Sequence, residues 1–226
     1  MKKLSQDELQ TIVSFIQKRG FTYIDVQTEV LDHVACRVED MISEDPELTL
    51  DAAIQKTHSE FGIFGFSTVE DGVISGLTKK YNRLFWRTFI SFLSPRYIFL
   101  VLFAGYFLYK VLATVDSKTC MYVLALGSVM TTLGYLYKSY RPEYNQYLAY
   151  RLSTAYFIVL GSMFSLMILI IDTAGSDFIY GIHPGYAIFA AFLVCFAMYV
   201  ISAVQTSRRG MQASEEIRQK YQWITT

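Results

Sequence analysis

The side chains with the greatest chemical potential lie in the first 60 residues. Asp32, His33 and Cys36 fall within about one helical turn of each other, and a second histidine, His58, follows farther along. Carboxylates, imidazole nitrogens and thiolates are the ligands that zinc takes in proteins. However, this segment has neither the Cys-x-x-Cys nor the His-x-x-x-His spacing, and His58 would have to come from another helix. The pattern favours a polar face used for a helix or protein contact, so we expect no metal and no cofactor.

The sequence offers no other constellation on which an enzyme could be built. We find no acid–base pair, no glycine-rich phosphate loop and no Ser/His/Asp arrangement, so we predict a protein without catalytic residues. The three cysteines, Cys36, Cys120 and Cys195, have no paired spacing and predict no disulfide framework.

Charge is distributed unevenly along the chain. The 226 residues have a formal net charge of zero and are 53% hydrophobic. Residues 1–71 nevertheless hold fourteen acids and six bases, whereas residues 72–96 hold five bases and no acid. This pattern divides the chain into an acidic head (residues 1–71), a basic neck (residues 72–96) and an apolar body (the rest of the chain). The partners we expect are the lipid bilayer and a protein or a second copy of the chain, and no nucleic acid.

Four apolar stretches are long enough to cross a bilayer, which takes about 20 residues in a helix. They cover approximately residues 97–115, 119–137, 152–171 and 186–206. Charged side chains lie at or outside their ends, except Lys110, which is near enough to one end to reach the interface. No acid lies in the middle of a span, which argues against proton- or ion-coupled transport.

Small residues recur four positions apart in three of the spans. This spacing lets helix backbones approach closely, either within the chain or against a partner. The pairs are Ser128/Thr132, Gly161/Ser165 and Ala187/Ala191.

Loop charge predicts the orientation of the spans. The basic segments are the neck, the loop between the second and third spans (Lys138, Arg141 and Arg151 against Glu143) and the tail from Arg208. They alternate with neutral or acidic loops without conflict. By the positive-inside rule, both termini lie in the cytoplasm.

The head is predicted to be a small helical bundle. A capping box, Ser5-x-x-Glu8, opens its first helix, and Gly20 ends that helix. Each of its three helices has one apolar stripe that it cannot bury alone. The expected helix ranges are 5–20, 22–45 and 49–62.

A second capping box, Ser67-x-x-Glu70, opens a linker helix that runs towards Pro95. Its apolar residues share one side, and four bases share the other: Lys79, Lys80, Arg83 and Arg87. This pattern is typical of a helix that lies in an anionic membrane surface. The same apolar face could instead pack on the head or the spans, with the bases solvated. Both readings stay open.

The sequence therefore predicts an all-α protein. It consists of a cytoplasmic helical domain (1–66), a basic amphipathic linker helix (67–95), a four-helix transmembrane domain (96–206) and a basic cytoplasmic tail (207–226).

Three short runs in the head resemble a known family. They are Val30-Leu31-Asp32-His33-Val34-Ala35-Cys36-Arg37-Val38-Glu39-Asp40, Leu50-Asp51-Ala52-Ala53-Ile54 and Glu60-Phe61-Gly62. Over residues 20–65 the head resembles the bacterial permease-prefix and HAAS-type N-terminal helical domains, although Asp45-Pro46-Glu47 stands where the family often has a glycine turn. The resemblance implies a bacterial inner-membrane protein and a role in regulation or assembly, since such domains occur on membrane proteins that include ABC permeases.

Two classes of function follow. The first is a non-enzymatic regulatory or scaffolding protein whose head binds a partner or a second copy, with Asp32, His33, Cys36 and Asp40 as the contact face. The second is a small transporter or pore, or an accessory subunit of an ABC-type permease. The absence of charges inside the spans favours the first class, and the resemblance to permease domains favours the second.

The predicted orientation can be tested by labelling in intact cells. Single cysteines at Ser117 and Ser176, in a background without the native cysteines, should react with an impermeant thiol reagent applied from outside. A cysteine at Asn145 should not react, because the positive-inside rule places it in the cytoplasm. Labelling at Asn145 would overturn the predicted orientation.

Overall fold

The computed structural model describes residues 3–60, 66–115, 118–173 and 183–221. Within these ranges the chain is helical and contains no strand, which confirms the all-α prediction. It divides into two compact units. The first unit comprises Met1–Tyr81, Glu143–Leu152 and Arg209–Thr226, and the second comprises Asn82–Pro142 and Ser153–Arg208.

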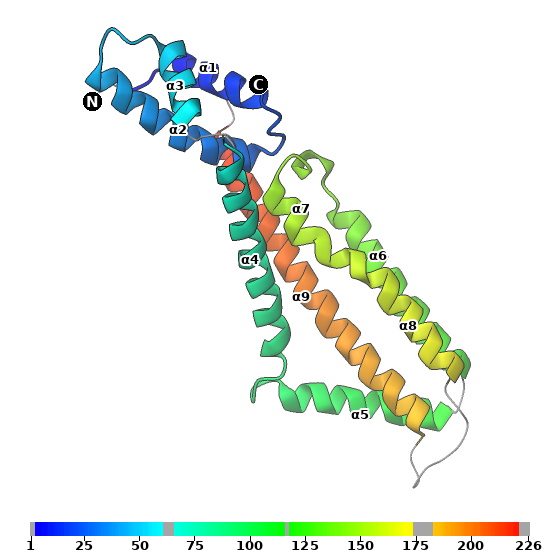
Figure 1. The fold of residues 1–226 in the computed structure, drawn as a ribbon. Coiled ribbons are helices and arrows are strands. Elements are labelled where there is room, and N and C mark those ends of the chain that lie inside the picture. The colour runs from blue at the N-terminus through cyan, green and yellow to red at the C-terminus, as the bar shows by residue number, and fades with distance from the viewer. Residues whose placement is uncertain (1–2, 61–65, 116–117, 174–182, 222–226) are drawn as a thin grey trace. The chain divides into compact units, whose positions relative to one another are not determined.

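The first unit is built on three helices, α1 (Gln6–Gln17), α2 (Ile24–Glu44) and α3 (Leu50–Glu60) (Figure 1). The predicted capping box is present. The amide of Glu8 donates to the Ser5 hydroxyl, and the amide of Ser5 donates to the Glu8 carboxylate at 2.7 Å. The helix ends at Gln17, three residues before the predicted end, and Gly20 in the turn that follows has a φ of 92°, which glycine adopts without a steric penalty. Phe61 and Gly62, expected at the end of α3, lie outside the described residues.

The core of the first unit is the apolar stripe of α2. Its side chains at four-residue spacing are fully buried, and they pack on residues of α1 and α3. This is the period expected when a helix buries one face. The buried apolar residues of the three helices include Val26, Val30, Val34 and Val38 of α2, Ile12 and Ile16 of α1, and Ala53 and Ile54 of α3. The predicted bundle is therefore present.

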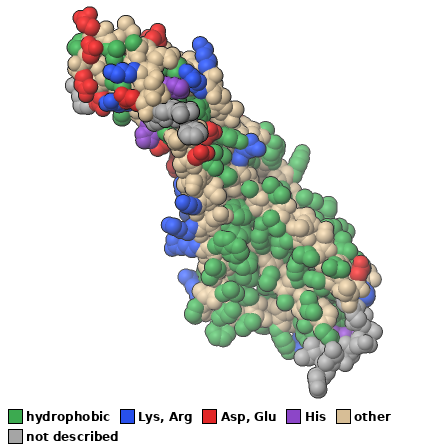
Figure 2. Space-filling view, in the orientation of Figure 1, with side chains coloured by type: hydrophobic (Ala, Val, Ile, Leu, Met, Phe, Trp, Pro, Cys, Tyr) green, Lys and Arg blue, Asp and Glu red, His purple; other side chains and the backbone are tan. Residues whose placement is uncertain are grey.

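The second unit contains most of four helical segments that are long and apolar enough to cross a membrane. They are α5 (Ile98–Val115), α6 (Lys118–Ser139), the segment Leu148–Thr173 and α9 (Pro184–Lys220). Hydrophobic side chains, coloured green in Figure 2, cover much of the visible surface of this unit. Such surface is stable against lipid but not against water, so the helices are consistent with a multi-pass membrane protein.

The buried cluster of the second unit gathers residues from one end of each of its four spans. It joins Leu112 of α5, Met121 of α6, Ile171 of α8 (Leu160–Thr173) and Phe189 of α9. In Figure 1, α6 and α8 lie side by side, whereas α5 crosses near the start of α9. The opposite half of α5 is exposed, with Phe99, at 76% exposure, its most exposed aromatic residue.

The third predicted span differs from the structure in its start and its regularity. The helical segment begins at Leu148, four residues before the predicted start, as α7 (Leu148–Thr154). It passes through a 3-10 turn (Ala155–Val159) before α8. The positions of Ser117 and Ser176, chosen above for labelling, lie outside the described residues.

The tail predicted from Ser207 onward is also different. Instead of ending with the fourth span, α9 continues to Lys220, and its end from Arg209 belongs to the first unit. Most residues from Met211 to Lys220 are of types that favour helix, namely Met, Gln, Ala, Glu, Arg and Lys. Side chains four residues apart also bond, since the Gln219 amide donates to the Glu215 carboxylate at 3.0 Å. The charges from Arg208 onward therefore end the apolar part of α9 and not the helix itself.

The linker α4 (Ser67–Ser91) contributes residues to both units, and within each unit apolar side chains of α4 pack against other residues of that unit. In the first unit Leu77 packs against the head core. In the second unit Phe85 is buried and stacks on Tyr156, with ring centroids 4.3 Å apart. The four predicted lipid-binding bases, Lys79, Lys80, Arg83 and Arg87, are all exposed. These contacts favour the protein-packing interpretation for Leu77 and Phe85, and the role of the bases stays a prediction.

Candidate functional site

A buried carboxylate near the start of α2 organises the first unit. Asp25 is 6% exposed and is the second residue of its helix. The amide N–H of Leu148 donates to one carboxylate oxygen at 2.9 Å, and that of Ala149 donates to the other at 2.7 Å. These amides open α7, where the first N–H groups have no partner within the helix. Asp25 therefore caps a helix more than 120 residues away in sequence.

The backbone adds a further bond beside this cap. The amide of Ile24 donates to the carbonyl of Gln146 at 3.0 Å. Ile24 also forms a buried cluster with Tyr147 and Tyr150, which are 0% and 4% exposed. Partly buried side chains from the end of α9, Met211 and Ile217, pack against this cluster. The start of α2, the segment before α7 and the end of α9 thus share one small core. We call this set of contacts the junction.

Polar contacts surround the junction. The Arg151 guanidinium donates to the Tyr23 hydroxyl at 2.6 Å, and the Tyr144 hydroxyl donates to the Glu215 carboxylate at 2.6 Å. A neutral hydrogen bond contributes about 1 kcal/mol, and a bond to a charged group somewhat more. These bonds fix the register of the three segments, while the buried side chains supply most of the stabilisation.

Burial sets the electrostatics of the junction. Burial raises the pKa of Asp25 above its usual range, and the hydrogen bonds from Leu148 and Ala149 oppose this shift. Burial also raises the pKa of Tyr81 to about 12, with a contribution from the negative charge of Asp25. The Tyr81 side chain is 1% exposed, and its hydroxyl has no hydrogen-bond partner among the described residues.

The residues predicted to bind a partner lie elsewhere on α2. Asp32, His33 and Cys36 are exposed, and Asp40 is half-buried. The His33 ring approaches Glu29, one turn earlier, at 3.6 Å, and the Tyr221 hydroxyl lies 3.4 Å from both oxygens of the Asp32 carboxylate. Three of the four side chains therefore lie on the surface of the head.

The fourth member of the imagined metal site is held away from this face. His58 contacts Phe15 and Phe66 edge-on, with ring centroids 5.7 and 5.0 Å away. Partial burial lowers the pKa of His58, and the charge of Arg19 adds to this shift. Within the described ranges, no group of three or more His, Cys, Asp or Glu side chains is arranged to hold a metal ion.

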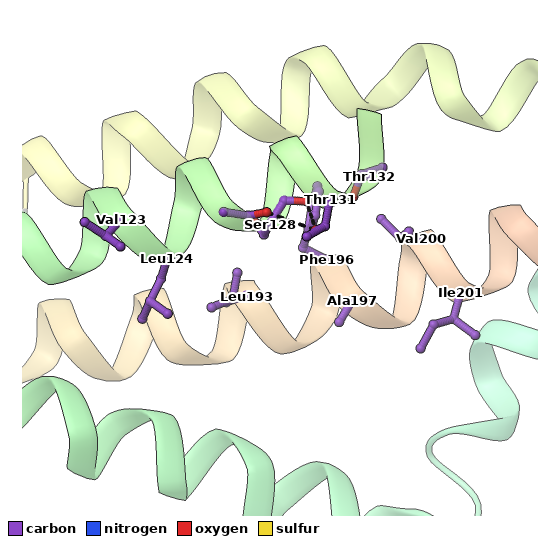
Figure 3. Close-up of a pocket in the computed structure, with 11 residues that line it drawn as sticks. Val123, Leu124, Ser128, Thr131, Thr132, Leu193, Phe196, Ala197, Val200 and Ile201 are labelled. Atoms are coloured by element: carbon purple, nitrogen blue, oxygen red, sulfur yellow. Dashed lines mark hydrogen bonds between the residues drawn. The ribbon is translucent and has the colours of Figure 1, made fainter. Parts of the chain in front are cut away.

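The spans enclose a groove between α6 and α9 with a volume of about 540 Å³ (Figure 3). Apolar side chains from both helices line it, together with three hydroxyls of α6. Each hydroxyl donates to a carbonyl of its own helix: Ser128 to Ala125 at 2.8 Å, Thr131 to Gly127 at 2.9 Å and Thr132 to Ser128 at 2.8 Å. The described residues that line the groove include no charged side chain, so the groove suits an apolar occupant better than an ion.

The small-residue pairs occupy different environments. Ser128 and Thr132 line the groove that faces α9, and Ala187 and Ala191 line a second groove that faces α5. Gly161 and Ser165 of α8 are exposed. Two of the three pairs therefore lie where one span faces another.

Sequence reasoning missed Asp25. Two signals were present: the acid sits between two apolar residues, Ile24 and Val26, and it lies in the first turn of a predicted helix. An acid in a buried stripe needs hydrogen-bond partners. Its partners are backbone amides, however, which have no sequence signature.

Comparisons with family models, curated proteins and solved structures found no match. The resemblance of residues 20–65 to permease-prefix domains therefore stays a prediction.

The effect of burial on Asp25 predicts a pH dependence. Because the raised pKa means that the folded state binds the proton more tightly, Asp25 should add to the free energy of unfolding as the pH falls. This contribution should be lost as the pH rises through the folded-state pKa. The variant Asp25→Asn cannot titrate there. Between about pH 7 and about pH 4, the melting temperature of the wild-type chain in detergent should rise relative to that of the variant.

A relative melting temperature that falls with pH over the same range would contradict this prediction. It would mean that the two amide donors hold the pKa of Asp25 below its usual range.

Proposed function

We propose that this chain is a non-enzymatic regulatory or scaffolding protein of the bacterial inner membrane. Its helical head faces the cytoplasm and binds a protein partner through the outer face of α2. The face comprises Asp32, His33, Cys36 and Asp40. The proposed orientation rests on the alternation of loop charge, and the bacterial assignment rests on the resemblance of the head.

The observation that carries the proposal is the cap that Asp25 provides to α7. α7 continues the chain into the third candidate span, and α9, whose end packs in the same junction, is the fourth. A partner that displaces α2 would therefore act on two membrane helices through hydrogen bonds and buried side chains. The equilibrium would be between α2 in its place at the junction and α2 displaced from it. A partner can shift this equilibrium only by the difference between its affinities for the two states.

The composition of the outer face supports a role in binding. A solvated helix face normally holds Lys, Glu or Gln, whereas His33 and Cys36 are only weakly polar and are exposed. Neither side chain belongs to the buried core of the head. Partner-binding surfaces are polar at their rim, and Asp32 and Asp40 lie before and after His33 and Cys36 on the same helix.

We expect the partner to be a second copy of this chain or another membrane protein in the same bilayer. A symmetric pair of heads is the simplest arrangement, because an isologous contact uses the same surface twice. The bases of α4, Lys79, Lys80, Arg83 and Arg87, would bind anionic lipid near the surface, at about 1 kcal/mol each.

Charge substitution on the outer face tests the proposal. We expect the full-length double variant His33→Glu with Cys36→Glu to keep its helicity and melting temperature, because both side chains are exposed. Co-purification of two differently tagged copies should fall by at least about tenfold, which corresponds to about 1.4 kcal/mol. The matched control is Gln55→Glu with Ser59→Glu, on the exposed side of α3. It adds the same charge to the head and should leave co-purification unchanged.

Three results would contradict the proposal. Unfolding of the double variant would mean that the face is part of the core. Stoichiometric zinc in the purified chain would mean a metal site. Equal co-purification of wild type, variant and control would mean that the outer face of α2 does not bind a second copy.

A further inference from the structure

A cation inside a candidate span is an unusual feature of the second unit. Lys110 lies in α5, five residues before its end at Val115. At 1.5 Å per residue this is about 7.5 Å from the end of the helix, a depth from which a lysine side chain can reach the interface. Its ammonium lies 5.7 Å from the centre of the Tyr106 ring. Lys110 forms no ion pair with a described residue.

Lys110 lines a groove between α5 and α9. The groove has a volume of about 620 Å³, within the range of ligand pockets in proteins. Small residues on both helices leave this space: a methyl group built on Gly105 meets no atom within 4 Å, and Ala187 and Ala191 face it from α9. Among the described lining residues, the polar side-chain groups besides Lys110 are the hydroxyls of Tyr106 and Tyr109 and the thiol of Cys195.

The polarity of the groove is therefore arranged along its length. The lining residues in the first half of α5, Val101, Leu102 and Gly105, are apolar or lack a side chain. Lys110 and Tyr109 lie towards the end of the helix. An occupant that fits this arrangement has a long apolar part and an anionic head, and the head must sit at the depth of the interface.

We propose that the groove between α5 and α9 binds an anionic phospholipid, with its phosphate against the Lys110 ammonium and an acyl chain along Gly105, Ala187 and Ala191. Charge complementarity favours this occupant over a neutral lipid, because among the described residues the ammonium contacts the Tyr106 ring and no anion. It also favours a lipid over a neighbouring apolar helix, which would leave the same charge without an anion.

Lipid retention by the purified full-length chain tests this inference. The protein is placed in nanodiscs of equal parts dioleoyl phosphatidylglycerol and dioleoyl phosphatidylcholine, then released, and the bound lipid is counted by native mass spectrometry. The two lipids have the same acyl chains, so their ratio reports the headgroup. Wild type should retain phosphatidylglycerol preferentially. Lys110→Gln should reduce that preference by about fivefold or more, the factor for one lysine at an anionic surface.

Two further variants separate the parts of the site. Lys118→Gln removes an exposed lysine at the start of α6, outside the groove lining, and should keep the wild-type preference. Ala191→Leu fills the groove and should reduce retention of both lipids, although Lys110 is intact.

Equal loss in the Lys118 and Lys110 variants would overturn the proposal, since the effect would then be general charge. Full retention by Ala191→Leu would also overturn it, because the lipid would not lie in the groove. A changed oligomeric state of Lys110→Gln without a change in bound lipid would assign the groove to a second protein chain instead.

Discussion

The carboxylate of Asp25 accepts two backbone hydrogen bonds from the start of α7, and the arrangement of the first unit depends on this contact. A buried charge is costly unless it is paired or hydrogen-bonded, and the first amides of a helix lack partners unless another group supplies them. Each of these groups satisfies the other. Removing the carboxylate would leave two buried donors without an acceptor, at a cost of about 1–3 kcal/mol each.

The rest of the first unit is organised around this contact. Tyr147, Tyr150 and Ile24 exclude water from it, and the end of α9 covers one side of the same cluster. A short segment between two candidate spans would normally be free to vary, as connecting loops are. Here the residues before α7 are held by the head instead. The span that follows therefore begins inside the first unit, and this explains why its helix starts at Leu148 rather than at the first residue of its apolar run.

The sequence predicted those parts of the fold that depend on residues close together in the chain. The capping box at Ser5 and the stripe of valines in α2 follow from hydrogen-bond geometry and from the helical period. The four spans follow from the length of apolar helix that a bilayer requires. The continuation of α9 to Lys220 did not follow, because its polar end is stabilised by packing of Met211 and Ile217 on residues distant in sequence. Asp25 was missed for the same reason: its partners are amides that any residue except proline could supply.

Hydrogen exchange at the start of α7 tests the central claim most directly. In the full-length chain, the amides of Leu148 and Ala149 should be protected in wild type, because Asp25 accepts both of them in a buried site. Asp25→Ala should raise their exchange by about tenfold or more, the factor for a loss of at least 1.4 kcal/mol. Asp32→Ala, which removes an exposed acid from the same helix, should leave both amides protected. Equal protection in wild type and in the Asp25 variant would contradict the account, because the head would then not depend on this carboxylate to hold the third span.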